Sequence, residues 1–137
     1  MVEVRAEIKL INTSDEALVR LGQLAKDKVR TYETDALVDT GAVSSVLPIH
    51  VVQQLGLFAV RKARASYANN SSENVDVTEA VGIEILNRPV TEETLVLGDE
   101  VIIGQTALER TDLLVDSLNR KVIPNPAHPD QPVIKIK

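Results

Sequence analysis

Hydrophobic and charged residues alternate at the start of the chain. Over positions 2–10 every even position is apolar and every odd position carries a charged side chain. This period of two predicts a β-strand with one buried and one solvent-exposed face. Further short apolar runs follow, bounded by residues that favour turns. The expected strands cover residues 2–10, 28–38, 43–47, 58–68, 75–86, 90–97, 101–103 and 112–116.

Three segments carry helical patterns instead. Three leucines at helical spacing follow a capping-box pair, Thr13 and Glu16, and predict a short helix or an irregular insertion over 16–26. Pro48 suits the first turn of a second helix, which Gly56 would end. The expected helical segments are residues 16–26, 48–55 and 105–110.

The end of the chain is rich in proline. Four prolines between Pro124 and Pro132 predict a linker-like stretch, and residues 133–136 are expected to form an edge strand. No internal repeat is visible, and 137 residues suit one domain. We therefore expect a single domain over 1–123, followed by a proline-rich linker and a C-terminal strand over 124–137.

The composition narrows the class of protein. The apolar residues, 44% of the chain, are mainly aliphatic, with one Phe, two Tyr and no Trp, which favours β structure. A net charge of −5 argues against nucleic acid as a partner. No signal peptide and no membrane-spanning stretch is recognisable, so we expect a cytoplasmic protein that does not bind membranes.

Metal and thiol chemistry have little support in the sequence. The chain has no cysteine, which excludes catalytic thiols and Cys-based metal sites. His50, in the segment after Pro48, and His128, in the proline-rich tail, are two isolated histidines. We expect both histidines to be solvated, and we expect no metal site and no cofactor.

The candidate chemistry lies in the run over 36–48. One apolar segment leads into Asp39-Thr40-Gly41-Ala42, and a second apolar segment leads out. This pattern predicts a carboxylate at the tip of a tight loop that is anchored in a sheet. An ordinary β-turn, with Asp at its first position and Gly supplying a positive φ, is the alternative explanation for Asp-Thr-Gly alone.

The surroundings of this loop favour a specific family. Ile102-Ile103-Gly104 lies further along the chain and opens a helical run. In between, the strands expected over 58–68 and 75–86 form a hairpin around the polar turn at 69–72. This order resembles the retroviral-type (retropepsin-like) aspartic proteases and their bacterial single-domain relatives over most of residues 28–118. The resemblance implies a mostly β, closed, barrel-like acid protease fold with one or two short helices, and aspartic-type endopeptidase activity.

The implied mechanism requires two carboxyl groups. One must be ionised to activate water, and the other must be protonated to hydrogen-bond the scissile carbonyl of a peptide or protein substrate. Two acids about 3 Å apart cannot both ionise, so their titrations split. Because the chain carries one such loop, the resemblance implies a homodimer in which Asp39 faces its symmetry mate.

The resemblance also implies roles for the neighbours of the catalytic Asp39. Thr40 would hydrogen-bond the partner loop, and Gly41 would offer its amide to the carboxylate. At Ala42 pepsin-like enzymes usually carry a Ser that hydrogen-bonds the acid, and its loss moves the expected pH optimum to about 4–6. A second loop would support the site with Ile102, Ile103 and Gly104.

Two features depart from the family pattern. The hairpin over 64–78 would be a flap that closes over substrate, but its tip lacks the glycines of the viral enzymes. The tip consists of Asn69, Asn70, Ser71 and Ser72. These residues either bind substrate or form a plain surface turn. Viral members also pair an Arg with an Asp where this chain has Gln105 and Val43.

Several alternatives stay open at this stage. A catalytically weak or inactive module of the same fold, used for dimerisation or protein binding, fits the two departures. An unrelated β-barrel interaction domain with an accidental Asp-Thr-Gly is a third reading. The terminal segments 2–10 and 133–136 would either interleave with a partner's strands or fold onto their own chain.

Overall fold

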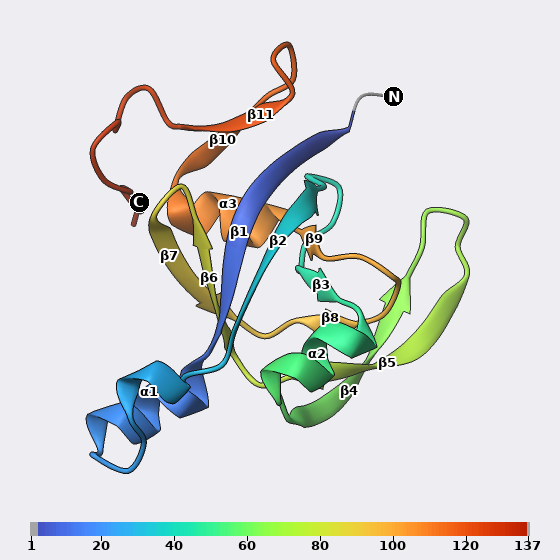
Figure 1. Cartoon of the computed structure of the whole chain (residues 1–137). Coiled ribbons are helices and arrows are strands. Elements are labelled where there is room, and N and C mark those ends of the chain that lie inside the picture. The colour runs from blue at the N-terminus through green and yellow to red at the C-terminus, as the bar shows by residue number, and fades with distance from the viewer. Residues whose placement is uncertain (1–2, 137) are drawn as a thin grey trace.

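The computed structural model describes residues 3–136 and is mostly β (Figure 1). Nine strands form one curled sheet in the order β4-β5-β8-β3-β9-β2-β1-β6-β7, and β10 pairs with β11 separately. The strands are β1 (Val4–Asn12), β2 (Thr31–Val38), β3 (Val46–Leu47), β4 (Ala59–Ser66), β5 (Ser72–Thr78), β6 (Val81–Ile85), β7 (Arg88–Glu92), β8 (Leu95–Val96), β9 (Ile102–Ile103), β10 (Leu113–Asp116) and β11 (Lys121–Pro124). The helices are α1 (Thr13–Arg20), α2 (Ile49–Leu55), α3 (Gln105–Thr111) and a 3-10 turn, η1 (Lys26–Lys28).

The expectation of a closed barrel is wrong. Strands β4 and β7 stand at the two ends of the strand order and do not pair with each other, so the large sheet is an open, curled half-barrel. The expectation of one or two short helices is also too low, because residues 3–136 contain three α-helices. The mostly β class is confirmed.

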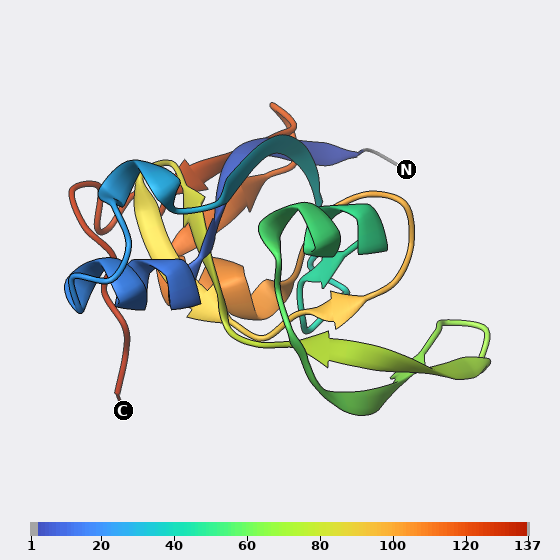
Figure 2. The same cartoon turned by 60° about the horizontal axis from the view of Figure 1, so that its bottom comes forward.

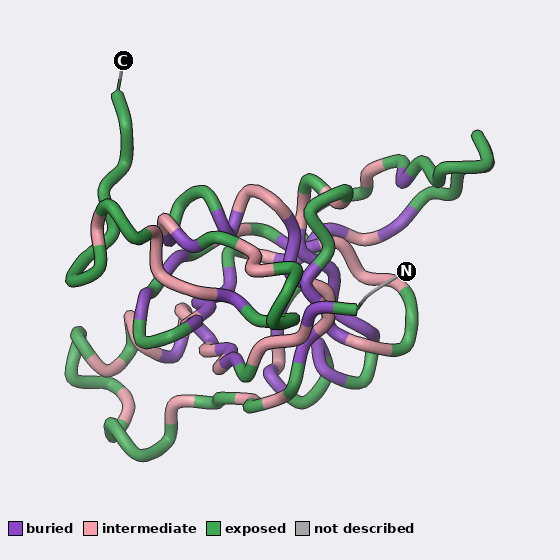
Figure 3. The backbone as a smooth tube through the Cα atoms, turned by 90° about the horizontal axis from the view of Figure 1, so that it is seen from above, coloured by how far each residue is buried: buried purple, intermediate pink, exposed green. Residues whose placement is uncertain are grey.

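The core lies inside the curl of the sheet. Strand β1 pairs with β2 on one side and with β6 on the other. Buried and less buried residues alternate along β1 broadly as the sequence predicts. Its residues Ile8 and Leu10 are buried beside Ile83 and Ile85 of β6. Figure 3 shows the buried residues through the centre of the molecule and the exposed ones in its projecting loops.

Helix α1 begins earlier than the capping-box pattern indicates. The side chain of Asn12, not Thr13, caps the helix by accepting a hydrogen bond from the Asp15 amide at 2.9 Å. The helix ends at Arg20, before Gly22 adopts a φ of 73°. Helix α1 and the β4–β5 hairpin project from opposite sides of the molecule (Figure 2).

Three expected strands are shorter than the apolar runs or are divided. The run over 43–47 forms a strand only at β3, since the acid loop extends to residue 44. The run over 75–86 is divided between β5 and β6, and the run over 90–97 lies in β7 and β8. In both cases the two halves of the run pair with different strands of the sheet. An apolar run alone does not reveal this change of partner.

The C-terminal segment differs most from expectation. Strand β11 pairs with β10 in an antiparallel hairpin, which was not predicted. Residues 133–136 form no strand; the Val133 amide instead donates to the Asp112 carboxylate at 3.0 Å. The division between a domain over 1–123 and a linker over 124–137 stays a prediction.

Candidate active site

Asp39 lies immediately after β2, which pairs with β1 on one side and with β9 on the other. Strand β9 in turn lies between β2 and β3, parallel to β2 and antiparallel to β3. The Asp39 amide donates to the carbonyl of Ile103 at 2.9 Å, which continues the β2–β9 ladder into the loop. Three separate parts of the sequence therefore fix the base of the acid loop.

The acid loop is a tight turn that holds its own carboxylate. The Gly41 amide donates to Oδ1 of Asp39 at 2.9 Å, and the Ala42 amide donates to the Asp39 carbonyl at 3.1 Å. A Cβ at Gly41 would lie 3.2 Å from the same Oδ1, so a side chain there would crowd the carboxylate. Asp39 and Thr40 are both solvent-exposed in the single chain.

A second loop packs directly against the acid loop. The amide of Gln105 donates to the Ala42 carbonyl at 2.7 Å, and that of Thr106 donates to the Val43 carbonyl at 3.1 Å. The Gly104 amide donates to Oγ of the fully buried Ser45 at 3.1 Å. The structure thus places Ile102, Ile103 and Gly104 beside Asp39.

Ser45 was not singled out from the sequence. Its signal was a hydroxyl inside an apolar run, which is unusual unless the hydroxyl has a buried partner.

Gln105 and Val43 stand where the viral enzymes have an ion pair. The Gln105 side chain bonds to Glu109 at 3.2 Å, and Val43 is 74% exposed. The two loops are joined here by the backbone hydrogen bonds from Gln105 to Ala42 and from Thr106 to Val43, not by a side-chain ion pair between Gln105 and Val43.

A groove of about 680 Å³ opens between the acid loop and the β4–β5 hairpin. Asp39 and Gly41 line one wall, and the hairpin contributes residues 64–68 to the other. The floor is aliphatic, with Val46, Leu95 and Ile102 among its residues. The arrangement can hold an extended chain with apolar side chains against an exposed carboxylate.

The tip of the hairpin lies beyond this groove. Asn70 has a φ of 67°, and Oδ1 of Asn69 accepts from the Ser71 amide at 3.0 Å, so the Asn-rich turn is tight without glycine. Among residues 69–72 none lines the groove, whereas Tyr67 does. Partial removal from water raises the pKa of Tyr67, and the nearby Glu73 carboxylate adds to that rise. Tyr67 was missed in the sequence because it falls outside the turn cluster.

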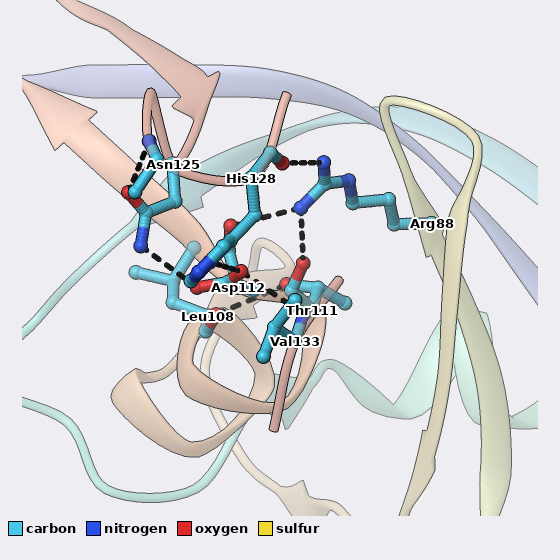
Figure 4. A network of polar contacts seen from close by, with 8 residues as sticks. Arg88, Leu108, Thr111, Asp112, Asn125, His128 and Val133 are labelled. Carbon is cyan, nitrogen blue, oxygen red and sulfur yellow. Dashed lines mark hydrogen bonds and ion pairs between the residues drawn. The ribbon is translucent and has the colours of Figure 1, made fainter. Parts of the chain in front are cut away.

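A polar cluster lies at the other end of α3 (Figure 4). The Asp112 carboxylate accepts from Nδ2 of Asn125 at 3.0 Å and from the Val133 amide at 3.0 Å, and lies 2.7 Å from Nδ1 of His128. The buried Arg88 donates to the carbonyls of Thr111, Asp112 and His128. His128 was expected to be solvated; its side chain is 35% exposed, and its ring is held by the Asp112 carboxylate, so it is only partly solvated.

Neither a metal site nor a membrane span is recognisable in residues 3–136. No group of three or more His, Cys, Asp or Glu side chains in that range is arranged to hold a metal ion. Nor does any helix there have the length and apolar character needed to cross a bilayer.

Comparison with known proteins bears on the fold. No protein-family model and no curated protein matches the sequence. The structure is similar to the crystal structure of the retroviral protease-like domain of Ddi1 from Leishmania major, with a TM-score of 0.59 and 14% sequence identity. The likeness covers 92% of this chain and 90% of that chain. It shows that the chain has a retropepsin-like fold.

Proposed function

We propose that the protein is a homodimeric aspartic endopeptidase that cleaves peptide bonds through Asp39 of two copies. The observation that carries this proposal is the Asp39 carboxylate itself. It is exposed in a tight, hydrogen-bonded loop, with Oδ1 held by the Gly41 amide, and it lines a largely apolar groove. The retropepsin-like fold supports the same function.

Dimerisation follows from the chemistry of the site. One carboxylate serves as the base that activates water, and a second, protonated carboxyl group polarises the substrate carbonyl. Within residues 3–136 no second carboxyl group lines the groove. A two-fold axis that passes beside the acid loop supplies the second group as the partner's Asp39.

The neighbouring residues take supporting roles in this proposal. Thr40, exposed in the single chain, hydrogen-bonds the partner loop across the axis. Gly41 and Ala42 shape the turn around the carboxylate, and Ile102, Ile103 and Gly104 hold it from behind.

The substrate is a peptide or protein segment with apolar side chains on both sides of the cut. Asn69, Asn70, Ser71 and Ser72 form the tip of a flap that closes over the bound segment. The hairpin already forms one wall of the groove. We place the activity in the cytoplasm, with a pH optimum of about 4–6, because Ala42 gives no hydroxyl donor to favour ionisation.

A second candidate function is a protein-binding or dimerisation module without useful activity. Two observations favour it: the flap tip lies outside the groove, and a neutral Gln105 and Val43 replace an ion pair. This candidate keeps the fold and the dimer but assigns no chemistry to Asp39.

Cleavage of a peptide library at pH 4–7 separates the two functions. We expect cleavage by the wild type, inhibition by a statine-type compound, and a loss of at least about a thousandfold in kcat/KM in Asp39→Asn. Asp99→Asn, which alters an exposed turn acid, is the matched control and should keep full activity. Cleavage that persists in Asp39→Asn rules out the aspartic mechanism, and no cleavage by a folded wild-type dimer favours the binding module.

A further inference from the structure

The groove beside Asp39 contains a cation. Arg64, in β4, lines it together with Asp39, and no other charged side chain of residues 3–136 does so. The rest of the lining is aliphatic, small or hydroxyl-bearing. The proposed chemistry accounts for the carboxylate of Asp39 but gives no role to this positive charge.

The three cations of β4 differ in how their charges are compensated. Arg61 and Lys62 each form an ion pair, with Glu93 and Asp76 respectively. Arg64 forms no ion pair within the part of the chain that the structure describes. The uncompensated cation of this strand is therefore the one that lines the groove.

Arg64 can exchange its present contact for a better one. It is solvent-exposed, and it stands opposite the neutral Asn74 in β5. Its Nη1 lies 3.5 Å from Oδ1 of Asn74, beyond the range of roughly 2.7–3.2 Å that is typical of an N–H···O hydrogen bond. A carboxylate offers a guanidinium two short, charge-assisted hydrogen bonds instead. The favoured partner of Arg64 is therefore a carboxylate.

A bound peptide can deliver that carboxylate. Arg64 belongs to the hairpin wall of the groove and Asp39 to the opposite wall, so a segment held between the walls passes both residues. Successive side chains of an extended segment point to opposite sides. Apolar side chains can thus contact the aliphatic floor while a neighbouring side chain reaches the hairpin. Closure of the hairpin removes water from this contact, which strengthens the attraction between opposite charges.

One carboxylate of the hairpin acts against this attraction. Removal from water raises the pKa of Tyr67, and the Glu73 carboxylate raises it further, which places a negative charge close to the hairpin wall. Glu73 does not itself line the groove, whereas Arg64 does. A bound segment therefore contacts the cation directly and meets the acid only from behind the wall.

We propose that Arg64 is a specificity-determining residue that selects substrates with an acidic side chain, Asp or Glu, near the bond that is cut. The acid does not flank the cut itself, where its charge would repel Asp39. A two-fold axis repeats Arg64 in the second half of the site, so an acid is selected on either side of the cut. This inference rests on the proposed function and names the substrate class of the same site.

Matched peptides test the selection at about pH 6, where a Glu side chain is ionised. A single Glu, Gln or Lys is scanned along each side of an apolar cut site. We expect the best Glu peptide to exceed its Gln counterpart by about five- to tenfold in kcat/KM, mainly through a lower KM, because the ion pair also forms in the ground state. Arg64→Gln should reduce this preference to less than about twofold.

A charge reversal gives a result that a purely structural role of Arg64 would not give. Arg64→Glu should prefer the Lys peptide to the Glu peptide. Lys62→Gln is the matched control, because Lys62 is a cation of the same strand that does not line the groove; it should keep the wild-type preference. Both positions are exposed, so circular dichroism should show unchanged folding.

Binding of the same peptides, measured by fluorescence anisotropy, separates this inference from the proposed function. Cleavage of Glu and Gln peptides at equal rates by the wild type overturns the role of Arg64 and leaves the protease intact. Binding that prefers Glu through Arg64, without any cleavage, overturns the protease and keeps the selection in a binding module. A folded wild type that neither cleaves nor binds any of the peptides overturns both.

Discussion

At the scale of single residues, Gly104 sets how closely the two loops of the site approach. A Cβ at this position would lie 2.7 Å from the carbonyl carbon and oxygen of Ser44 and 2.9 Å from the carbonyl oxygen of Ala42. These atoms belong to the backbone and cannot rotate away. The glycine is therefore required by the contact itself, since its φ of −92° is open to any residue.

We expect Gly104→Ala to destabilise the fold by about 1–3 kcal/mol, because an added methyl group forces the two loops apart. Chemical denaturation followed by circular dichroism measures the change. Gln105→Ala is the matched control: it removes only an exposed side-chain contact to Glu109 and should change stability by less than about 0.5 kcal/mol. Equal stability of Gly104→Ala and wild type would show that the loops are not packed as described.

At the scale of elements, a carboxylate at the end of α3 holds the C-terminal segment. Asp112 follows the helix in a left-handed conformation, with a φ of 56°. The hydrogen bond from the Asn125 side chain, followed by that from the Val133 amide, lowers the pKa of Asp112 below its ordinary value of 3.8. The proline-rich segment is thus tied to the helix that packs against the acid loop.

We call the hydrogen bonds of Asp112 to Asn125 and Val133 the Asp112 clamp. The clamp predicts a pH dependence of stability. Because the pKa of Asp112 is lowered in the folded state, its contribution is fully present above pH 3.8 and is lost as the pH falls through the lower folded-state value. Asp112→Asn lacks this contribution at every pH. Its Tm should therefore lie below that of the wild type at pH 7, and the gap should narrow from pH 4 to pH 2, in the range where folded carboxylates titrate.

Differential scanning calorimetry of the two proteins across this range measures the gap. Asp130→Asn serves as the control, because Asp130 is exposed in the same segment and its replacement should leave the Tm gap near zero throughout. Asp116, whose pKa is also lowered, is present in all three proteins and cancels in the comparison. A gap for Asp112→Asn that stays constant with pH would contradict the clamp.

The elements also show how far the sequence could predict this fold. Period-two alternation was enough for β1, and the Pro48 and Gly56 signals were enough for α2, because both patterns are local. Strands β3, β8 and β9 have two residues each, and distant partners define them rather than their own sequence. The Asp112 clamp joins residues 112 and 133, which are distant in the sequence. Neither this contact nor the hydrogen bond between Asp112 and His128 produces a pattern in the local sequence.

At the scale of the whole molecule, the groove of the candidate site contains no carboxyl group other than that of Asp39 among residues 3–136. The groove beside Asp39 is bounded by the β4–β5 hairpin on one wall. A smaller recess of about 380 Å³ lies between the acid loop and the β10–β11 hairpin. The Asp-Thr-Gly loop and the Ile-Ile-Gly segment could be recognised in the sequence. The recess, the β10–β11 hairpin and the position of Tyr67 could not, because they depend on how the curled sheet brings distant loops together.

A mixture of active and inactive chains tests whether two copies of Asp39 act together. If hydrolysis needs both carboxyl groups, only dimers of two wild-type chains are active, so activity follows the square of the wild-type fraction. Equal amounts of wild type and Asp39→Asn, exchanged at fixed total concentration, should then show about one quarter of the wild-type activity. A mixture with Asp99→Asn should keep full activity, because Asp99 lies in an exposed turn. About one half of the activity in the Asp39→Asn mixture would mean that each Asp39 acts alone, which contradicts a shared site.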